Sequence, residues 1–171
     1  FGSMGDRLWH LARGQDKRRV SRNAPIKSIS NETTFFEDTI DREILLGHLW
    51  RMCEKVTDRA KARELAGTVA TLKLKTTKHV VLTRRVTLRD PTQMAETLFQ
   101  ATKSLLDQMD QKQAYRLIGA GLSRLHPDTL ADRTPDLLDP TAAQLATVER
   151  ARDEIRKKFG NDAIIKGRSL R

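Results

Sequence analysis

Two neighbouring segments with alternating apolar and polar residues constrain the fold of this chain most strongly. In residues 68–77, Ala70, Leu72 and Leu74 alternate with threonines and lysines. This period of two is typical of a β-strand with one buried and one exposed face. Residues 80–88 repeat the pattern after a short turn. The pair predicts a β-hairpin with a single apolar face.

The flanking segments extend the hairpin into a two-layer domain. The predicted elements are a strand at 26–35, a helix capped by Asp38 or Thr39 and ending near Gly67, the hairpin, a helix opened by Asp90, Pro91 and Thr92, and a strand at 115–125. This β-α-β-β-α-β order predicts an α+β two-layer sandwich: a four-stranded antiparallel sheet with two helices on one face. The other sheet face should be bare.

Positive charge is concentrated on the predicted hairpin. The 171-residue chain carries 32 Lys and Arg against 22 Asp and Glu, a net charge of +10. Within residues 68–90 the only acid is Asp90, the last residue. Alternation places Lys73, Lys75 and Arg85 on the bare face. A basic, hydroxyl-rich sheet face suits phosphates, which we favour over an ordinary solvated surface.

Arg84 falls in the apolar phase of its strand. Either it lies beyond the covered part of the core, or a β-bulge turns it to the other face.

The residue pattern does not indicate a catalytic, metal or cofactor site. The four histidines are scattered, and the single cysteine, Cys53, is interpreted as a half-buried structural thiol. Gly119 and Gly121 lie inside a strand pattern, which favours close packing of the strand on a helix over a phosphate-binding loop. The chain has neither a membrane-spanning apolar run nor the layout of a signal peptide. Its single cysteine excludes a disulfide framework, so we expect a protein of the reducing cytoplasm.

The two ends differ from this central region. Residues 1–4 are interpreted as a cloning remnant outside the fold, 5–16 as a short helix, and 17–25 as a basic linker. Residues 128–140 predict an extended acidic linker, followed by a C-terminal helix and tail at 141–171. Docking of that helix is left open. Its apolar stripe of Leu145, Val148, Ile155 and Phe159 favours docking, whereas Lys157 and Lys158 favour solvent or DNA.

Four segments, in order and spacing, resemble the little finger domain of the Y-family DNA polymerases, most closely its bacterial polymerase IV branch. They are KSISNETTF (27–35), TVATLKLK (68–75), TRRVTL (83–88) and RLIG (116–119). The resemblance extends over residues 5–126. It implies the end of the thumb at 5–16, a linker at 17–25 and a little finger DNA-binding domain at 26–127.

The resemblance implies that this chain is the C-terminal region of a translesion polymerase. The catalytic carboxylates of that family lie in its palm, so this region should be inactive alone, with no cofactor; the full enzyme would use magnesium. The implied partner is a template–primer DNA duplex, bound through phosphates independently of sequence. By position, the contacts fall on Lys27, Ser28, Lys73, Lys75, Arg84, Arg85, Thr87 and Arg116.

A second partner implied by the resemblance is the sliding clamp. Asp136, Leu137 and Leu138 lie in a polar segment suited to a clamp-binding peptide, although they lack the glutamine and terminal aromatic residue of the family's pattern. Alternatively, the two leucines pack back onto the domain.

Two other functions remain open for the whole chain. One is a protein-interaction adaptor that does not grip DNA directly, and the other is a small-molecule enzyme with a similar fold. We expect a monomer.

Overall fold

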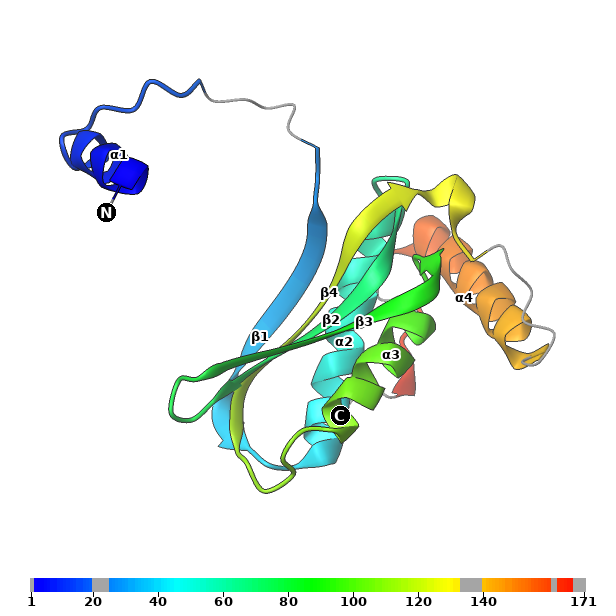
Figure 1. The fold of residues 1–171 in the computed structure, drawn as a ribbon. Coiled ribbons are helices and arrows are strands. Elements are labelled where there is room, and N and C mark those ends of the chain that lie inside the picture. Colours follow the sequence, from blue (N-terminus) through cyan, green and yellow to red (C-terminus); the bar gives the residue numbers. More distant parts are fainter. Residues whose placement is uncertain (1, 20–24, 133–139, 161–162, 168–171) are drawn as a thin grey trace.

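The chain folds into a four-stranded sheet with helices along one side. The computed structural model describes residues 2–19, 25–132, 140–160 and 163–167 (Figure 1). Its elements are α1 (Gly2–Ala12), β1 (Ser28–Thr39), α2 (Arg42–Lys61), β2 (Leu65–Thr76), β3 (Val81–Thr92), α3 (Ala95–Asp107), β4 (Tyr115–Pro127), the 3-10 helix η1 (Asp128–Leu130) and α4 (Pro140–Phe159). The predicted β-α-β-β-α-β order is confirmed.

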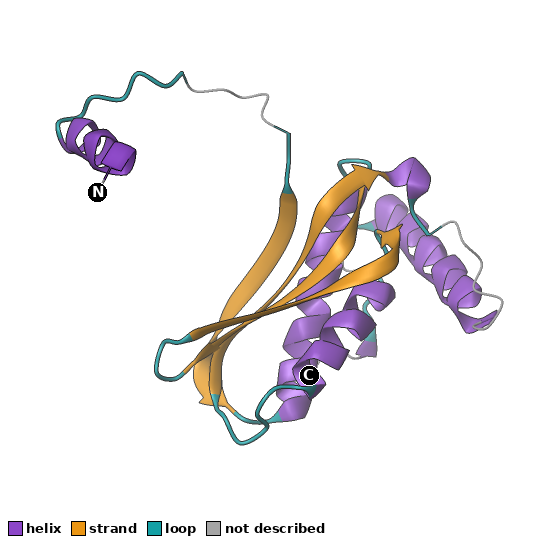
Figure 2. Ribbon diagram, in the orientation of Figure 1, coloured by secondary structure: helices purple, strands orange, loops and turns teal. Residues whose placement is uncertain are grey.

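The sheet is antiparallel, with the strand order β1-β4-β2-β3. Helices α2 and α3 lie on the same face, as Figure 2 shows. The core between the two layers includes Leu49 and Trp50 of α2, Leu98 of α3, Leu72 of β2 and Ile118 of β4, all 0–1% exposed. The predicted two-layer sandwich is therefore confirmed, and the opposite sheet face is left uncovered by α2 and α3.

Helix α2 begins later than predicted, because β1 continues to Thr39. The N-cap is Asp41, and neither Asp38 nor Thr39 fills that role. The Asp41 carboxylate accepts hydrogen bonds from the backbone N–H groups of Glu43 (2.8 Å) and Ile44 (3.3 Å). These two donors have no partner within the helix, so the cap satisfies them.

Helix α3 also begins later than predicted, and Pro91 does not open it. Pro91 lies in β3, whose last residue is Thr92, and the helix starts at Ala95. Strand β3 is at the edge of the sheet. A proline is tolerated there because its missing N–H removes no hydrogen bond from the interior of the sheet.

The N-terminal helix is longer than predicted. Helix α1 begins at Gly2 rather than at residue 5, so residues 2–4, which we expected to lie outside the fold, are helical.

The start of the predicted acidic linker is packed onto the end of the sheet. The Asp128 N–H donates to the Glu64 carbonyl (2.9 Å), and the Asp132 N–H donates to the Pro91 carbonyl (2.9 Å). Residues 128–132 are therefore not the extended segment that was predicted.

Helix α4 docks onto α2 through charged side chains. Glu149 and Arg152 are 2% and 4% exposed. Arg152 donates to Glu54 Oε1 (2.9 Å), while Lys61 Nζ lies 2.8 Å from Glu149 Oε1 and 2.5 Å from Asp153 Oδ2. We call these five residues the α2–α4 ion cluster. The long side chains of Lys61 and Arg152 bridge the two helices.

Glu149 also completes the start of helix α3. The α3 N-cap is Met94, which has no side-chain cap hydrogen bond. The Glu149 carboxylate instead accepts from Ala95 N (2.8 Å) and from Glu96 N (3.4 Å). A carboxylate at this position also interacts favourably with the helix dipole. Helix α4 therefore supplies a cap that the local sequence of α3 lacks.

The apolar stripe of α4 does not form this junction. Its members remain between 39% and 67% exposed: Leu145, Val148, Ile155 and Phe159. The stripe was a reason to expect docking, and the helix docks, but through the neighbouring charged side. The charged side chains can satisfy the buried N–H groups of α3, which an apolar stripe cannot do.

Candidate nucleic-acid interface

The uncovered sheet face carries hydroxyl groups, glycines and cations. The strand register assigns to it Ser28, Ser30, Glu32 and Thr34 of β1; Leu117, Gly119, Gly121 and Ser123 of β4; Val69, Thr71, Lys73 and Lys75 of β2; and Val81, Thr83, Arg85 and Thr87 of β3. We call this set the open face. Hydroxyls and cations are the side-chain groups that bind phosphate oxygens.

Two glycines form the floor of the open face. A Cβ on Gly119 would lie 2.8 Å from Glu32 Cβ and 3.0 Å from the Asn31 carbonyl oxygen, and one on Gly121 would lie 3.0 Å from Ser30 Cβ. Both glycines thus pack closely against the neighbouring strand β1 on the uncovered face, whereas the sequence analysis expected close packing of the strand on a helix. The hollow above them has a volume of about 270 Å³ and is bordered by β1, β2 and β3 residues.

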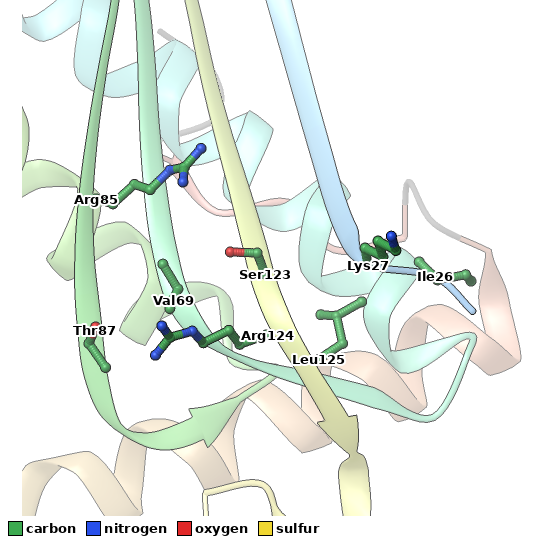
Figure 3. Close-up of a pocket in the computed structure, with 8 residues that line it drawn as sticks. All are labelled: Ile26, Lys27, Val69, Arg85, Thr87, Ser123, Arg124 and Leu125. Carbon is green, nitrogen blue, oxygen red and sulfur yellow. The ribbon is translucent and has the colours of Figure 1, made fainter. Parts of the chain in front are cut away.

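A second, more open hollow of about 620 Å³ lies at the end of the sheet near the start of β1. Figure 3 shows its lining, which includes the cations Lys27, Arg85 and Arg124 and the hydroxyl residues Thr87 and Ser123. Lys27, Arg85 and Thr87 were predicted contact residues, and the structure brings them to one surface.

Arg124 was missed by the sequence analysis. In a regular strand it would point away from the open face, since Ser123 points toward it. Its backbone φ of 50° breaks that alternation, and its side chain lines the second hollow (Figure 3). The available signal was a basic residue near the strand end, but a local backbone irregularity cannot be read from composition.

Arg84 lies outside the open face. It is paired with Leu72, a core residue, so it belongs to the helix-side phase, and no register shift occurs near it. It is nevertheless exposed, because β3 is the edge strand. Of the two alternatives, the first is therefore confirmed: Arg84 lies beyond the covered core.

Arg116 is placed at the hairpin end of the sheet. Its guanidinium lies 2.7 Å from His79 Nε2, in the turn between β2 and β3. Arg116 is thus separated from the second hollow, which Lys27, Arg85 and Arg124 line at the opposite end of the sheet.

Lys73 carries an ion pair on the open face. Its Nζ lies 2.6 Å from Glu32 Oε2, and the two side chains are 39% and 48% exposed. Lys75, Arg85 and Arg124 form no such pair within the described part of the chain. The three unpaired cations are therefore more available to a phosphate than Lys73.

The remaining site predictions concern the clamp-binding segment, Cys53 and metal ligands. Asp136, Leu137 and Leu138 lie outside the described residues. Cys53 is buried, and this burial raises the pKa of its thiol to about 12. Within the described ranges, no three His, Cys, Asp or Glu side chains gather as a metal site would require, and no helix is long and apolar enough to cross a bilayer.

Bacterial polymerases are similar to this chain in sequence. It is 45% identical over 172 residues to DNA polymerase IV of Caulobacter vibrioides, covering 100% of this chain and 42% of that protein. It is 42% identical over 167 residues to DNA polymerase IV of Brucella melitensis, covering 98% of this chain and 37% of that protein. The chain thus spans about two fifths of the length of these relatives.

Solved structures share the fold. The little finger domain of PolIV, in its complex with the beta-clamp processivity factor, aligns with a TM-score of 0.51 and 19% identity over 64% of this chain and 97% of that one. The Dbh DNA polymerase, in a post-insertion binary complex, aligns with a TM-score of 0.51 and 15% identity, over 71% and 35%.

The family model that matches is the impB/mucB/samB family C-terminal domain, over residues 26–137. This match covers more than half of the chain and the whole sheet with α2 and α3. The chain therefore belongs to the impB/mucB/samB family and contains its C-terminal domain.

Proposed function

We propose that this chain is the little finger region of a translesion DNA polymerase of the polymerase IV type, and that its open face binds the phosphates of a template–primer duplex. The similarity to proteins named DNA polymerase IV supports the first part. The second part rests on one observation: Lys27, Arg85 and Arg124, which come from three segments, line a hollow beside the floor of glycines and hydroxyls. The adaptor and small-molecule alternatives have no comparable support.

The dimensions of the open face suit a duplex groove. Three interstrand spacings of about 4.8 Å make the sheet about 14 Å wide, similar to the roughly 12 Å major groove of B-DNA. Cations at both ends can then reach phosphates along the groove. Such contacts fix position without reading sequence, which suits a polymerase that must hold a damaged template.

The open face has no aromatic side chain among its assigned residues. Base stacking, the usual mode of single-strand binding, is therefore disfavoured relative to duplex backbone contacts. We assign nucleotide addition, and any magnesium it uses, to the part of the relatives' length that this chain does not span. A cytoplasmic location agrees with a bacterial DNA partner.

Fluorescence anisotropy of a labelled template–primer duplex tests the proposal. With three to five phosphates neutralised, log Kd should depend on log salt with a slope of about 2.7 to 4.5, so affinity should fall about 40- to 500-fold between roughly 50 and 200 mM salt. Lys75→Ala/Arg85→Ala/Arg124→Ala should reduce the slope by about 2 to 3. Duplexes of different sequence should bind equally.

A matched variant separates this interface from total charge. Lys55→Ala/Lys112→Ala/Lys157→Ala removes the same charge from exposed positions on α2, on the α3–β4 loop and on α4. It should bind DNA nearly as well as the unmodified chain. Equal losses in both triple variants, or a slope near zero in the unmodified chain, would rule out the open face as the DNA interface.

We also propose that Asp136, Leu137 and Leu138 contact the sliding clamp. The structure of a little finger domain with its clamp supports a contact of this kind. Titration of Leu137→Ala/Leu138→Ala against the clamp should show weaker binding than the unmodified chain. Ile164→Ala/Ile165→Ala, which changes two exposed residues elsewhere, is the control. Unchanged affinity of the first variant would refute this role.

A further inference from the structure

A carboxylate stands within the proposed DNA-binding surface. Glu32 of β1 and Lys73 of β2 are both aligned with Gly119 of β4, one from each side. Their side chains meet over this glycine at 2.6 Å. Among the residues assigned to the open face, Glu32 is the single acid.

The glycine makes this bridge possible. The strands that carry Glu32 and Lys73 are two interstrand spacings, or about 9.6 Å, apart. With a Cβ at Gly119 the strands could not keep their present approach, since the Cβ would lie 2.8 Å from Glu32 Cβ. The two charged side chains therefore lie across an open floor, where a DNA strand would also have to lie.

The ion pair is weak enough to be exchanged. Both partners are more than a third exposed, and ion pairs between exposed side chains contribute little to stability. A phosphate approaching Lys73 offers the same kind of charge-assisted hydrogen bond as the Glu32 carboxylate. Lys73 can bind either the Glu32 carboxylate or a DNA phosphate at close range. When the phosphate is bound, the carboxylate is displaced and repels it.

We propose that Glu32 is an internal competitor of DNA: it occupies Lys73 in the free domain and holds down the affinity of the open face for phosphate. This inference rests on the proposed function of the open face. The consequence is a moderate affinity for DNA, which suits a domain that must release the duplex as the polymerase advances. A carboxylate that merely positioned Lys73 for DNA would have the opposite effect on affinity.

The test is Glu32→Gln, which keeps the shape of the side chain and removes its charge. At about 50 mM salt we expect template–primer binding about three- to fivefold tighter than in the unmodified chain. The salt slope should steepen by about 0.9, so this advantage should shrink about 3.5-fold by roughly 200 mM. Glu32→Thr, which suits a strand, should show the same direction.

Glu154→Gln is the matched control. It removes one negative charge from an exposed position on α4, away from the sheet. Its affinity should stay close to that of the unmodified chain. Circular dichroism melts of all variants establish that each is folded.

The outcomes distinguish this inference from the proposed function. Steep, open-face-dependent binding by the unmodified chain, combined with unchanged or weaker binding by both Glu32 variants, overturns the competitor role alone. An absence of salt-dependent binding in the unmodified chain overturns the proposed function itself. An equal gain in Glu154→Gln assigns the effect to net charge and also overturns the competitor role.

Discussion

Replacement of Glu149 measures how much helix α4 contributes to the stability of the domain. Glu149→Ala removes an acceptor for Ala95 N and a partner of Lys61 from a side chain that is 2% exposed. The lost cap costs about 1 kcal/mol. Breaking a buried ion pair costs about 3–5 kcal/mol when one charge is left alone, but Lys61 keeps Asp153, so about 2 kcal/mol is expected here. The free energy of unfolding should fall by about 3 kcal/mol, a large part of a typical 5–15 kcal/mol.

Urea unfolding followed by circular dichroism tests this value. Glu149→Gln retains an oxygen that can accept from Ala95 N but loses the charge, so about half of the loss is expected. Glu154→Ala, an exposed change on the same helix, should shift the free energy of unfolding by less than about 0.5 kcal/mol. If Glu149→Ala is as stable as Glu154→Ala, the ion cluster does not hold α4, and the reasoning fails.

Three further predictions follow from buried or crowded positions. Gly119→Ala should cost about 1–3 kcal/mol in urea unfolding, because its Cβ would crowd Glu32; a smaller loss would show that β1 can move away. Cys53, with its thiol pKa raised to about 12 by burial, should resist iodoacetamide in the folded protein and react in denaturant, as mass spectrometry can show; rapid labelling of folded protein would contradict this. Burial raises the pKa of the Asp132 carboxyl above 3.8, so the folded state binds this proton more tightly and loses stability as pH rises past 3.8. Asp132→Asn should therefore be more stable than the unmodified chain at neutral pH and equal to it in acid; a pH-independent difference in thermal melts would refute this.

The fold could be predicted where local periodicity carries the information. The alternation of Leu72 and Leu74 with lysines gave the faces of the hairpin correctly, because a strand's period of two is set within a few residues. The residues at which helices and strands begin and end were predicted less accurately. The Asp90–Pro91 pair has the form of a helix start, yet β3 continues through it, and only its place at the sheet edge explains why.

The site was predicted in part for the same reason. Lys75 and Arg85 followed from alternation and lie on the open face. The pairing of Lys73 with Glu32 depends on the β1-β4-β2 order and on the glycine between them, which are properties of the assembled sheet. Arg124 depends on one unusual backbone angle. Neither the Lys73–Glu32 ion pair nor the orientation of Arg124 can be predicted from the local sequence pattern.

The cap that Glu149 provides for helix α3 has a consequence for the order of folding. The cap lies 54 positions after the N–H group it satisfies. On a ribosome, α3 would emerge and pack against the sheet long before Glu149 is synthesised, with its first turn bonded to water. The nascent domain would therefore pass through a state with a frayed α3 end, and α4, which is synthesised later, would complete it. Because all four strands precede Glu149 in the chain, α4 should dock onto a sheet that has already been synthesised.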